Sequence, residues 1–312
     1  DVQRSSSSAY CVVDDDFART QFPGPTRGLA ALKVTAAHEF FHAVQFSYDY
    51  LEDTWLMEGT AAWMEDEVFD NINDNRQFLH ASPLARSTIP LDLSLAPYHY
   101  GAWIFWRYLS ERFDPGLVRE VWEQADGARV GGRLYSLAAT RAALSARGLS
   151  FGAALGGFSV ANRRPVTGYE EGRAYPLAPT SRTWTLRAPG ASTGWRSRSL
   201  EHLTSRSFAF RTAGTTSRRL RLELLVPLRA TGSEARLLVY RRNGTVSVRS
   251  LRAGAGTKTT VLLRVGNALR FELVLVNAST RITGCGLFST LFSCSGKPLD
   301  DRRRYSFRAT LV

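Results

Sequence analysis

The spacing of apolar residues changes along the chain, from a helical period in the first half to a two-residue period in the second. Before residue 165, apolar side chains recur every three or four positions, which places them on one face of an α-helix. The ranges predicted as helices are 29–46, 54–69, 100–113, 115–123, 135–147 and 150–162. Ahead of them, a short apolar run at 9–13 predicts a strand in which Cys11 is buried.

Beyond residue 180, apolar and polar residues alternate, as they do in strands with one buried face. The ranges predicted as strands are 182–188, 206–211, 219–226, 235–240, 245–250, 258–264, 270–276 and 304–311. Proline and glycine are frequent just before this half, which is typical of a linker. The pattern predicts an α+β protein: a mostly helical domain at 1–165, a linker at 166–179, and an all-β sandwich or jelly roll at 180–312.

The charges are divided unevenly between the two halves. Residues 180–312 hold 24 of the 40 basic residues and 6 of the 28 acidic ones. Such a basic module either binds an anionic surface polymer or carries an arginine-rich face that is merely solvated. Arginine supplies nearly all of the charge, which favours the solvated face, and no specific nucleic-acid binding is predicted. No run of eighteen apolar residues occurs, so no membrane span is expected.

Three cysteines indicate the redox environment. Cys285 and Cys294 lie nine positions apart in a segment rich in glycine and serine, where they form either a short disulfide loop or two free thiols. A disulfide is typical of exported proteins, so the disulfide hypothesis also predicts a secreted protein.

A metal-binding pattern lies in the first predicted helix, where residues 38–42 read His-Glu-Phe-Phe-His. Residues four apart share a helix face, so His38 and His42 can present their rings to one ion. Glu39 follows the first histidine and can reach a water molecule at that ion. The flanking residues are apolar, and buried imidazoles in such a helix need polar partners that a metal would supply.

A catalytic zinc site takes three protein ligands, so a third is expected elsewhere. The metzincin pattern would place glycine and histidine where this chain has Gln45 and Tyr48, which excludes that class. Glu58 lies sixteen residues after His42, beyond a short polar stretch at 47–53. If that stretch reverses the chain between two helices, the Glu58 side chain can lie against the two histidines.

These residues resemble the gluzincin metallopeptidases, in which HExxH on one helix is followed by a glutamate ligand on the next. Here HEFFH at 38–42 precedes WLMEGTAAW at 55–63. The chain from about Val12 to Asn162 is also similar to a family of largely uncharacterised bacterial proteins classed as metalloproteases. The segments that carry this similarity are 12–17, 35–49, 55–70 and 100–113.

The resemblance implies a zincin-like catalytic domain. It implies Zn²⁺ held by His38, His42 and Glu58, with Glu39 as the general base. Thermolysin-like relatives have aspartate where this chain has Ala62, so peptide specificity is not carried over. A single predicted strand precedes the HExxH helix, which leads us to expect a truncated or atypical N-terminal subdomain.

Further groups are expected around such a site. Ligand histidines donate their second N–H to a carboxylate or carbonyl, and Glu65 and Asp66 are the candidates, unless they form a solvated helix end. Tyr100 and His99 could stabilise the oxyanion that develops during hydrolysis, or could pack and cap the helix start.

Other polar residues are expected to be structural. Asp70, Asn73 and Asp74 are spaced like calcium ligands, but a polar turn with helix capping is the favoured interpretation. His80 and His202 lie far from the motif and are predicted to be structural or surface residues.

The leading hypothesis is zinc-dependent hydrolysis of peptide bonds in a protein or peptide substrate, with Glu39 as base. One alternative is a non-catalytic extracellular binding or adhesion protein that works through its basic β-sandwich. Another is a metallohydrolase that acts on substrates other than peptides.

Overall fold

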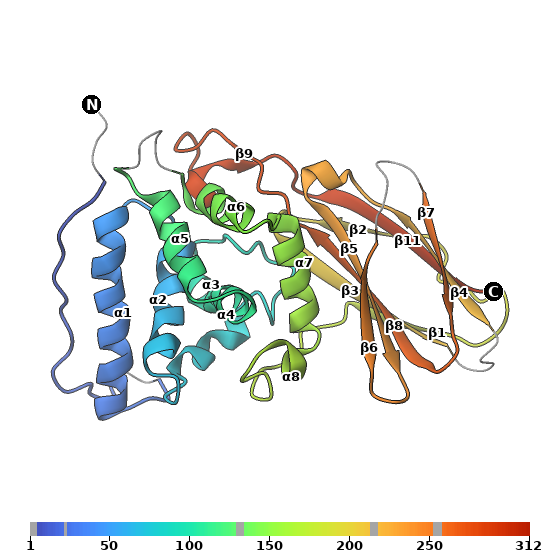
Figure 1. Ribbon diagram of the computed structural model, residues 1–312, viewed down its shortest axis with the longest axis horizontal. Helices are drawn as coiled ribbons and strands as arrows, with labels where there is room; N and C mark the ends of the chain where they lie inside the picture. The colour runs from blue at the N-terminus through green and yellow to red at the C-terminus, as the bar shows by residue number, and fades with distance from the viewer. Residues whose placement is uncertain (1–4, 22–23, 129–133, 213–217, 252–257) are drawn as a thin grey trace.

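A computed structural model of the chain describes residues 5–21, 24–128, 134–212, 218–251 and 258–312. Helices form one end of the molecule and two β-sheets form the other (Figure 1). The described part of the chain contains no helix that is both long and apolar enough to cross a lipid bilayer.

Every range that the sequence predicted as a helix is helical, with small shifts at its ends, and short helices at 74–81 and 165–168 form where none was predicted. In chain order they are α1 (Gly28–Tyr48), α2 (Thr54–Val68), the 3₁₀ helix η1 (Asp74–Ala81), α3 (Tyr98–Gly101), α4 (Trp103–Arg112), α5 (Gly116–Ala125), α6 (Ser136–Ala146), α7 (Phe151–Asn162) and α8 (Pro165–Gly168). The predicted helix 100–113 is therefore two shorter helices that meet near Ala102.

The helical core lies around α2, which packs against α1 on one side and α4 on the other. Trp55 of α2 is fully buried and stacks on Trp106 of α4 with 5.5 Å between ring centroids. Gly59 makes this approach possible, because a Cβ there would lie 3.0 Å from the Trp106 indole nitrogen. Phe40, on the outer face of α1, is 66% exposed.

The second half forms a β-sandwich. The strands are β1 (Arg182–Leu186), β2 (Arg196–Leu200), β3 (Thr204–Thr212), β4 (Arg219–Leu225), β5 (Ser233–Arg241), β6 (Val246–Ser250), β7 (Thr259–Arg264), β8 (Ala268–Asn277), β9 (Ile282–Thr283), β10 (Lys297–Pro298) and β11 (Arg303–Leu311). The two sheets of the sandwich have the orders β1-β3-β8-β5-β6 and β2-β11-β4-β7, and β9 and β10 pair in a separate two-stranded sheet. Among the described strands only the β1–β3 pair is parallel.

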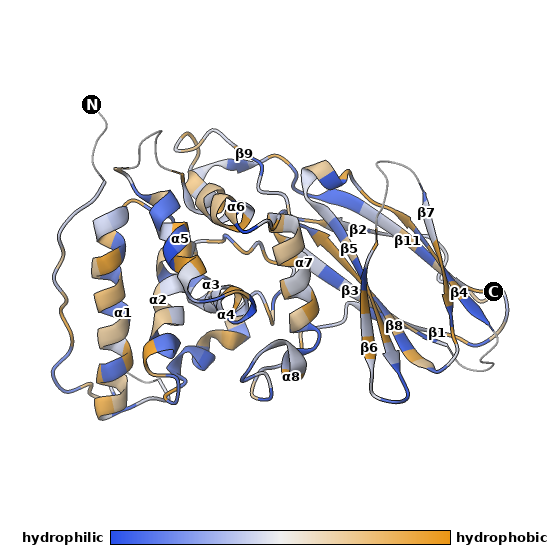
Figure 2. Cartoon of the chain, in the orientation of Figure 1, coloured by the Kyte–Doolittle hydropathy of each residue, from blue (hydrophilic) through white to orange (hydrophobic). Residues whose placement is uncertain are grey.

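Residues from both sheets share one hydrophobic core, which includes Phe208 of β3 and Phe307 of β11. Their ring centroids are 4.6 Å apart. Hydrophobic and hydrophilic residues alternate along the strands (Figure 2). All eight strands predicted in this half form, although β6 has no buried residue.

The two halves of the molecule are packed against each other. Helix α7 lies on the sheet that contains β5 and β8, and the Arg163 guanidinium just after α7 bonds to the buried Glu272 carboxylate of β8. The segment predicted as a linker, 166–179, buries Tyr169 and Tyr175 against the helical core. Residues 166–179 are therefore part of the helical core and not a free linker.

One prediction is confirmed and one is wrong among the cysteines. A disulfide joins Cys285 to Cys294. The strand predicted at 9–13 does not form, and Cys11 is an exposed free thiol. An apolar run needs a neighbouring strand to complete its hydrogen bonds, and this segment has no ladder partner among the described strands.

Candidate metal centre

Two helices bring three candidate ligands to one point. His38 and His42 project from the same face of α1, and their rings meet edge to face with 4.6 Å between centroids. Glu58 projects from α2, and its Oε2 lies 3.2 Å from His38 Nε2 and 3.5 Å from His42 Nε2. One donor atom from each residue lies within 4.8 Å of the other two. The His42 and Glu58 side chains remain 17% and 19% exposed, so solvent reaches this point.

The opposite nitrogen of each ring is held by another side chain. His38 Nδ1 lies 2.7 Å from Glu65 Oε1, so Glu65 takes the supporting position considered for it from the sequence. His42 Nδ1 lies 2.6 Å from Gln45 Oε1. Such partners fix the ring orientation and leave the Nε2 atoms free for a metal.

Gln45 is the residue that sequence reasoning missed. It is almost completely buried, and its Nε2 donates to the Met57 carbonyl and to Thr60 Oγ1, each at 2.9 Å. Gln45 therefore links His42 to the helix that carries Glu58. A polar residue three positions after His42, between Val44 and Phe46, was the available signal.

The electrostatics of the site reflect the close contact of its charges. Burial by itself would raise the pKa of the Glu58 carboxyl, but hydrogen bonds from His38 and His42 lower it to about 2. Burial opposes the charged form of His38, yet Glu58 and Glu65 together raise its pKa to about 9. For Glu65, burial dominates over the contact with His38 and raises the pKa to about 7. The carboxylate of Glu58 is thus ionised across the physiological range.

Asp66, the other candidate for supporting a histidine, points elsewhere. Its Oδ2 lies 3.3 Å from Arg107 Nη1, and the Arg107 side chain is 7% exposed. Burial raises the pKa of Asp66 to about 6, although Arg107 lowers it. The prediction for Asp66 is wrong because successive residues on a helix face different directions, and only Glu65 faces α1.

Tyr100 lies beside the three ligands. Its ring centroid is 6.0 Å from that of His38, and Phe78 stacks on the Tyr100 ring with 4.9 Å between centroids. Burial, followed by the nearby charges of Glu58, Glu39 and Glu65, raises the pKa of Tyr100 to about 12. The phenol therefore keeps its proton at neutral pH, and the half-buried Glu39 lies near it.

The His99 ring packs edge to face against the Tyr100 ring, with 4.5 Å between their centroids. It is buried, and neither ring nitrogen has a hydrogen-bond partner among the described residues. Burial lowers the pKa of His99, which keeps the ring neutral. Its contacts are those of a packing residue.

The remaining candidates lie away from the site. Asp74 accepts a hydrogen bond from Gln77, and Asp70 lies 3.8 Å from Arg107, so they do not converge with Asn73 on a shared point. His80 is exposed and contacts the Gln77 carbonyl.

His202 is buried, as expected for a structural residue, between two carboxylates. Its Nε2 lies 2.8 Å from Asp92 Oδ1 and its Nδ1 lies 2.6 Å from Asp301 Oδ1. Apart from the three ligands, Asp14, Asp15 and Asp16 are the one further group in the described chain whose donor atoms lie close enough together to hold a metal ion.

The donor set fits zinc. Two imidazoles and one carboxylate, with one side open to solvent, are the ligand types and number found in catalytic zinc sites. The supporting contacts of Glu65 and Gln45 add the outer partners that such ligands need.

Comparisons with known proteins give only distant similarities. A scan against models of protein families finds no match, and a search among curated proteins finds no match either. Among solved structures, the chain is similar to the pre-peptidase C-terminal domain of a collagenase from Bacillus anthracis, with TM-score 0.24 and 10% identity over 44% of this chain and 100% of that one.

Two further solved structures are similar at the same level. PliG, a periplasmic inhibitor of g-type lysozyme from Aeromonas hydrophila, gives TM-score 0.22 and 8% identity over 42% of this chain and 98% of that one. A family 16 carbohydrate-binding module gives TM-score 0.23 and 15% identity over 36% and 73%. Similarities this distant carry no information about the function of this chain.

Proposed function

We propose that the protein is a secreted zinc metallopeptidase of the gluzincin type, with a zincin-like catalytic domain in its helical half. The observation that supports this most directly is the approach of Glu58 Oε2 to both histidine Nε2 atoms. His38, His42 and Glu58 would hold the metal. Zinc bound there would supply Lewis acidity, which makes water a nucleophile near neutral pH.

The side chains around the ligands have separate tasks in this proposal. Glu39 accepts a proton from the attacking water at its carboxylate and passes it to the leaving amine. Tyr100 keeps its phenolic proton at neutral pH and donates a hydrogen bond to the oxyanion that develops on the peptide carbonyl. Glu65 and Gln45 hold the two rings in place. The substrate is a protein or peptide that reaches the exposed side of the ligands.

The test compares wild type with Glu39→Gln, using zinc analysis and cleavage of casein and fluorogenic peptides. Both proteins should bind one zinc ion, because Glu39 is not a ligand, and the variant should lose about 10² to 10⁴-fold in turnover. His42→Ala is the matched control that should lose the metal itself. Turnover that survives Glu39→Gln would contradict the proposed role of the base.

Two other outcomes would select the alternatives. Bound zinc with no turnover of any substrate would favour a non-catalytic binding or adhesion protein. Turnover of esters or other non-peptide substrates alone would favour a different metallohydrolase. We also propose that the basic β-sandwich binds anionic surface polymers. Retention of the protein on a polyanion column at increasing salt concentration would test this.

A further inference from the structure

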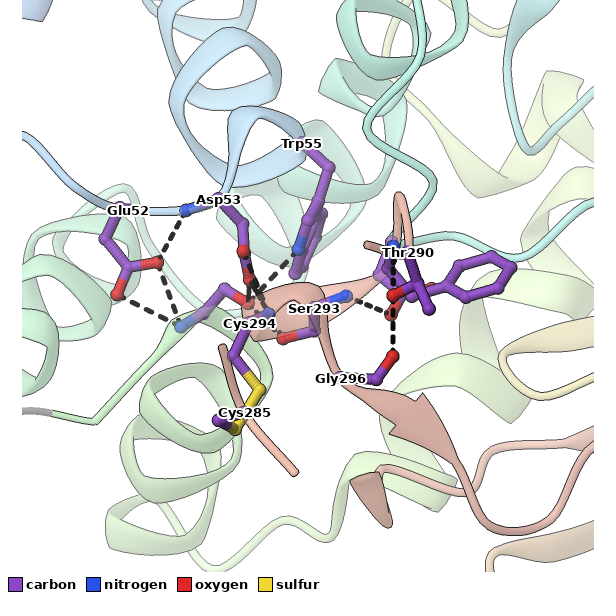
Figure 3. The surroundings of a disulfide bond; sticks show 11 residues. Glu52, Asp53, Trp55, Cys285, Thr290, Ser293, Cys294 and Gly296 are labelled. Atoms are coloured by element: carbon purple, nitrogen blue, oxygen red, sulfur yellow. Dashed lines mark hydrogen bonds between the residues drawn. A yellow bond between two sulfur atoms is a disulfide. The ribbon is translucent and has the colours of Figure 1, made fainter. Parts of the chain in front are cut away.

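A loop of the β-sandwich reaches across the molecule to the start of helix α2. Between β8 and β11 the chain leaves the sheet, and the disulfide Cys285–Cys294 closes part of this excursion. Leu291 in the loop accepts a hydrogen bond of 2.8 Å from the Ser94 backbone of the helical half. Figure 3 shows the disulfide next to Asp53 and Trp55. We call residues 285–294 the disulfide loop.

The disulfide loop contacts the helical half mainly through Asp53, the residue immediately before α2. The backbone N–H of Cys294 lies 2.9 Å from both carboxylate oxygens of Asp53, and Ser293 Oγ donates to Asp53 Oδ2 at 2.9 Å (Figure 3). Ser136 at the start of α6 donates to the same oxygen. A second contact joins the Ser293 backbone N–H to the fully buried Asp92 at 3.0 Å.

The direction of the Cys294 N–H depends on the shape of the loop. Cys294 has a φ of 49°, in the left-handed region that residues with a side chain rarely adopt. Such a conformation persists only where the surroundings hold it. The bond to Cys285 and the hydrogen bonds to Asp53 are what hold it here.

Asp53 lies close in sequence to the metal ligands. Glu58 follows it by five residues, which is little more than one helical turn. The Met57 carbonyl, also in this part of α2, accepts the hydrogen bond from Gln45 that in turn positions His42. Trp55, in the same turn of α2, donates to Ser136 Oγ at 3.2 Å, and Ser136 in turn donates to Asp53.

We propose that the disulfide loop and Asp53 position the metal centre by fixing the first turns of α2. This inference rests on the proposed function only where it concerns zinc affinity. Loss of the disulfide would free the Cys294 backbone and weaken its hydrogen bonds to Asp53. The first turns of α2 would then move more, and Glu58 would spend less time against the two histidines. A reductant would lower metal affinity without touching a ligand.

The test uses full-length proteins in a Cys11→Ser background, so that no third thiol can exchange with the disulfide. The variants are Cys285→Ser/Cys294→Ser, Asp53→Ala with the disulfide intact, and Glu272→Gln. The last is the control, because Glu272 also joins the two halves of the molecule but does so at α7. It should cost stability without loosening α2.

Two measurements are made on each protein. Hydrogen exchange of the metal-free form reports on residues 54–60, and zinc affinity is measured by competition with a chromogenic chelator. Losing the disulfide or the Asp53 carboxylate should speed exchange in 54–60 and weaken zinc binding, each about 10-fold. Asp53→Asn keeps an oxygen acceptor for the Cys294 N–H and should restore much of both. In Glu272→Gln, exchange should rise in α7 instead.

The outcomes separate this inference from the proposed function. The inference would be overturned if hydrogen exchange in residues 54–60 were unchanged in both Cys285→Ser/Cys294→Ser and Asp53→Ala. It would also be overturned if Glu272→Gln changed exchange in 54–60 as much as those variants do. If the double cysteine variant does not fold, Asp53→Ala and Asp53→Asn still decide it. A parent protein that binds no zinc would overturn the proposed function, while the exchange data would still test the positioning of α2.

Discussion

Gln45 determines how His42 is presented, because it holds the ring nitrogen that faces away from Glu58. Its amide group has three partners, since the Oε1 contacts His42 and the Nε2 donates to Met57 and Thr60. The amide oxygen accepts from His42 Nδ1–H, which fixes the tautomer with a lone pair on Nε2. That tautomer is the one that can bind a metal.

Replacing Gln45 by leucine should weaken zinc binding about 10- to 100-fold, the usual cost of losing an outer partner of a ligand histidine. The change keeps the side-chain volume but removes the acceptor for His42 Nδ1 and the hydrogen bond that Gln45 donates to the Met57 carbonyl. Competition titration with a chelator measures the effect. Gln77→Leu, at a half-buried glutamine outside the site, is the matched control. Equal zinc affinity in Gln45→Leu and wild type would show that His42 needs no such support.

The sequence identified the three candidate ligands but only part of what surrounds them. His38 and His42 follow from helical spacing, and Glu58 from the short turn before α2. Gln45 and Glu65 could be placed only by knowing how α1 is rotated against α2. That rotation also decides that Asp66 faces Arg107, which no local pattern reveals.

At the scale of elements, Gly59 sets the distance between α2 and α4. A Cβ at this position would lie 3.0 Å from Trp106 Nε1 and 3.2 Å from Ala102 Cβ, closer than ordinary contact. Both neighbours are fully buried, so neither can move into solvent. Residue 59 also follows Glu58, so the packing of α2 on α4 and the position of the ligand are coupled.

Gly59→Ala should therefore destabilise the protein. Overpacking of a tight core costs about 1 to 3 kcal/mol, and the better helix propensity of alanine offsets up to about 1 kcal/mol of it. Gly152→Ala is the matched helical control, because its Cβ would lie 3.4 Å from Glu234, an ordinary contact, and it should be neutral or slightly stabilising. Urea unfolding compares the two, and equal stability of both variants would contradict the packing argument.

Most helices and strands could be predicted from the sequence, because their buried faces leave a periodic pattern of apolar residues. Seven of the eight strands predicted in this half contribute buried residues to the sandwich core, so their alternation was visible, whereas β6 has no buried residue. Strand β2 was missed because the sequence Arg196–Leu200 is mostly polar. The apolar run at 9–13 shows the converse, since its composition suits a strand but it pairs with none of the described strands.

At the scale of the whole molecule, the acidic residues of the basic half are engaged in ion pairs. Each of the six has a cationic partner, and the pairs are Glu201–Arg302, Glu223–Arg308, Glu234–Arg229, Glu272–Arg163, Asp300–Arg303 and Asp301–His202. One of them, Glu272–Arg163, joins the sandwich to the helical half, and His202 of the last pair also contacts Asp92 of the helical half. The excess of arginine over these acids keeps the half basic.

His202 is a titratable link between the two halves through its contact with Asp92. Burial opposes its charged form, but Asp92 and Asp301 raise its pKa to about 9, from 6.5. A folded-state pKa above the unfolded value means that the charged pair stabilises the fold fully below pH 6.5 and loses this contribution as the pH rises toward 9. The shift corresponds to about 3 kcal/mol.

We therefore expect the thermal stability of the wild type to fall between pH 6.5 and 9, and His202→Gln to reduce that slope. The variant should be less stable than wild type at pH 6, where the charged histidine contributes most, and the difference should shrink by pH 9. His38 titrates in the same range, so it is the difference between the two proteins that isolates His202. His80→Gln, at an exposed histidine, should keep the wild-type slope. If His202→Gln and wild type lose stability in parallel across this range, the buried contact with Asp92 and Asp301 does not hold the halves together through its charge.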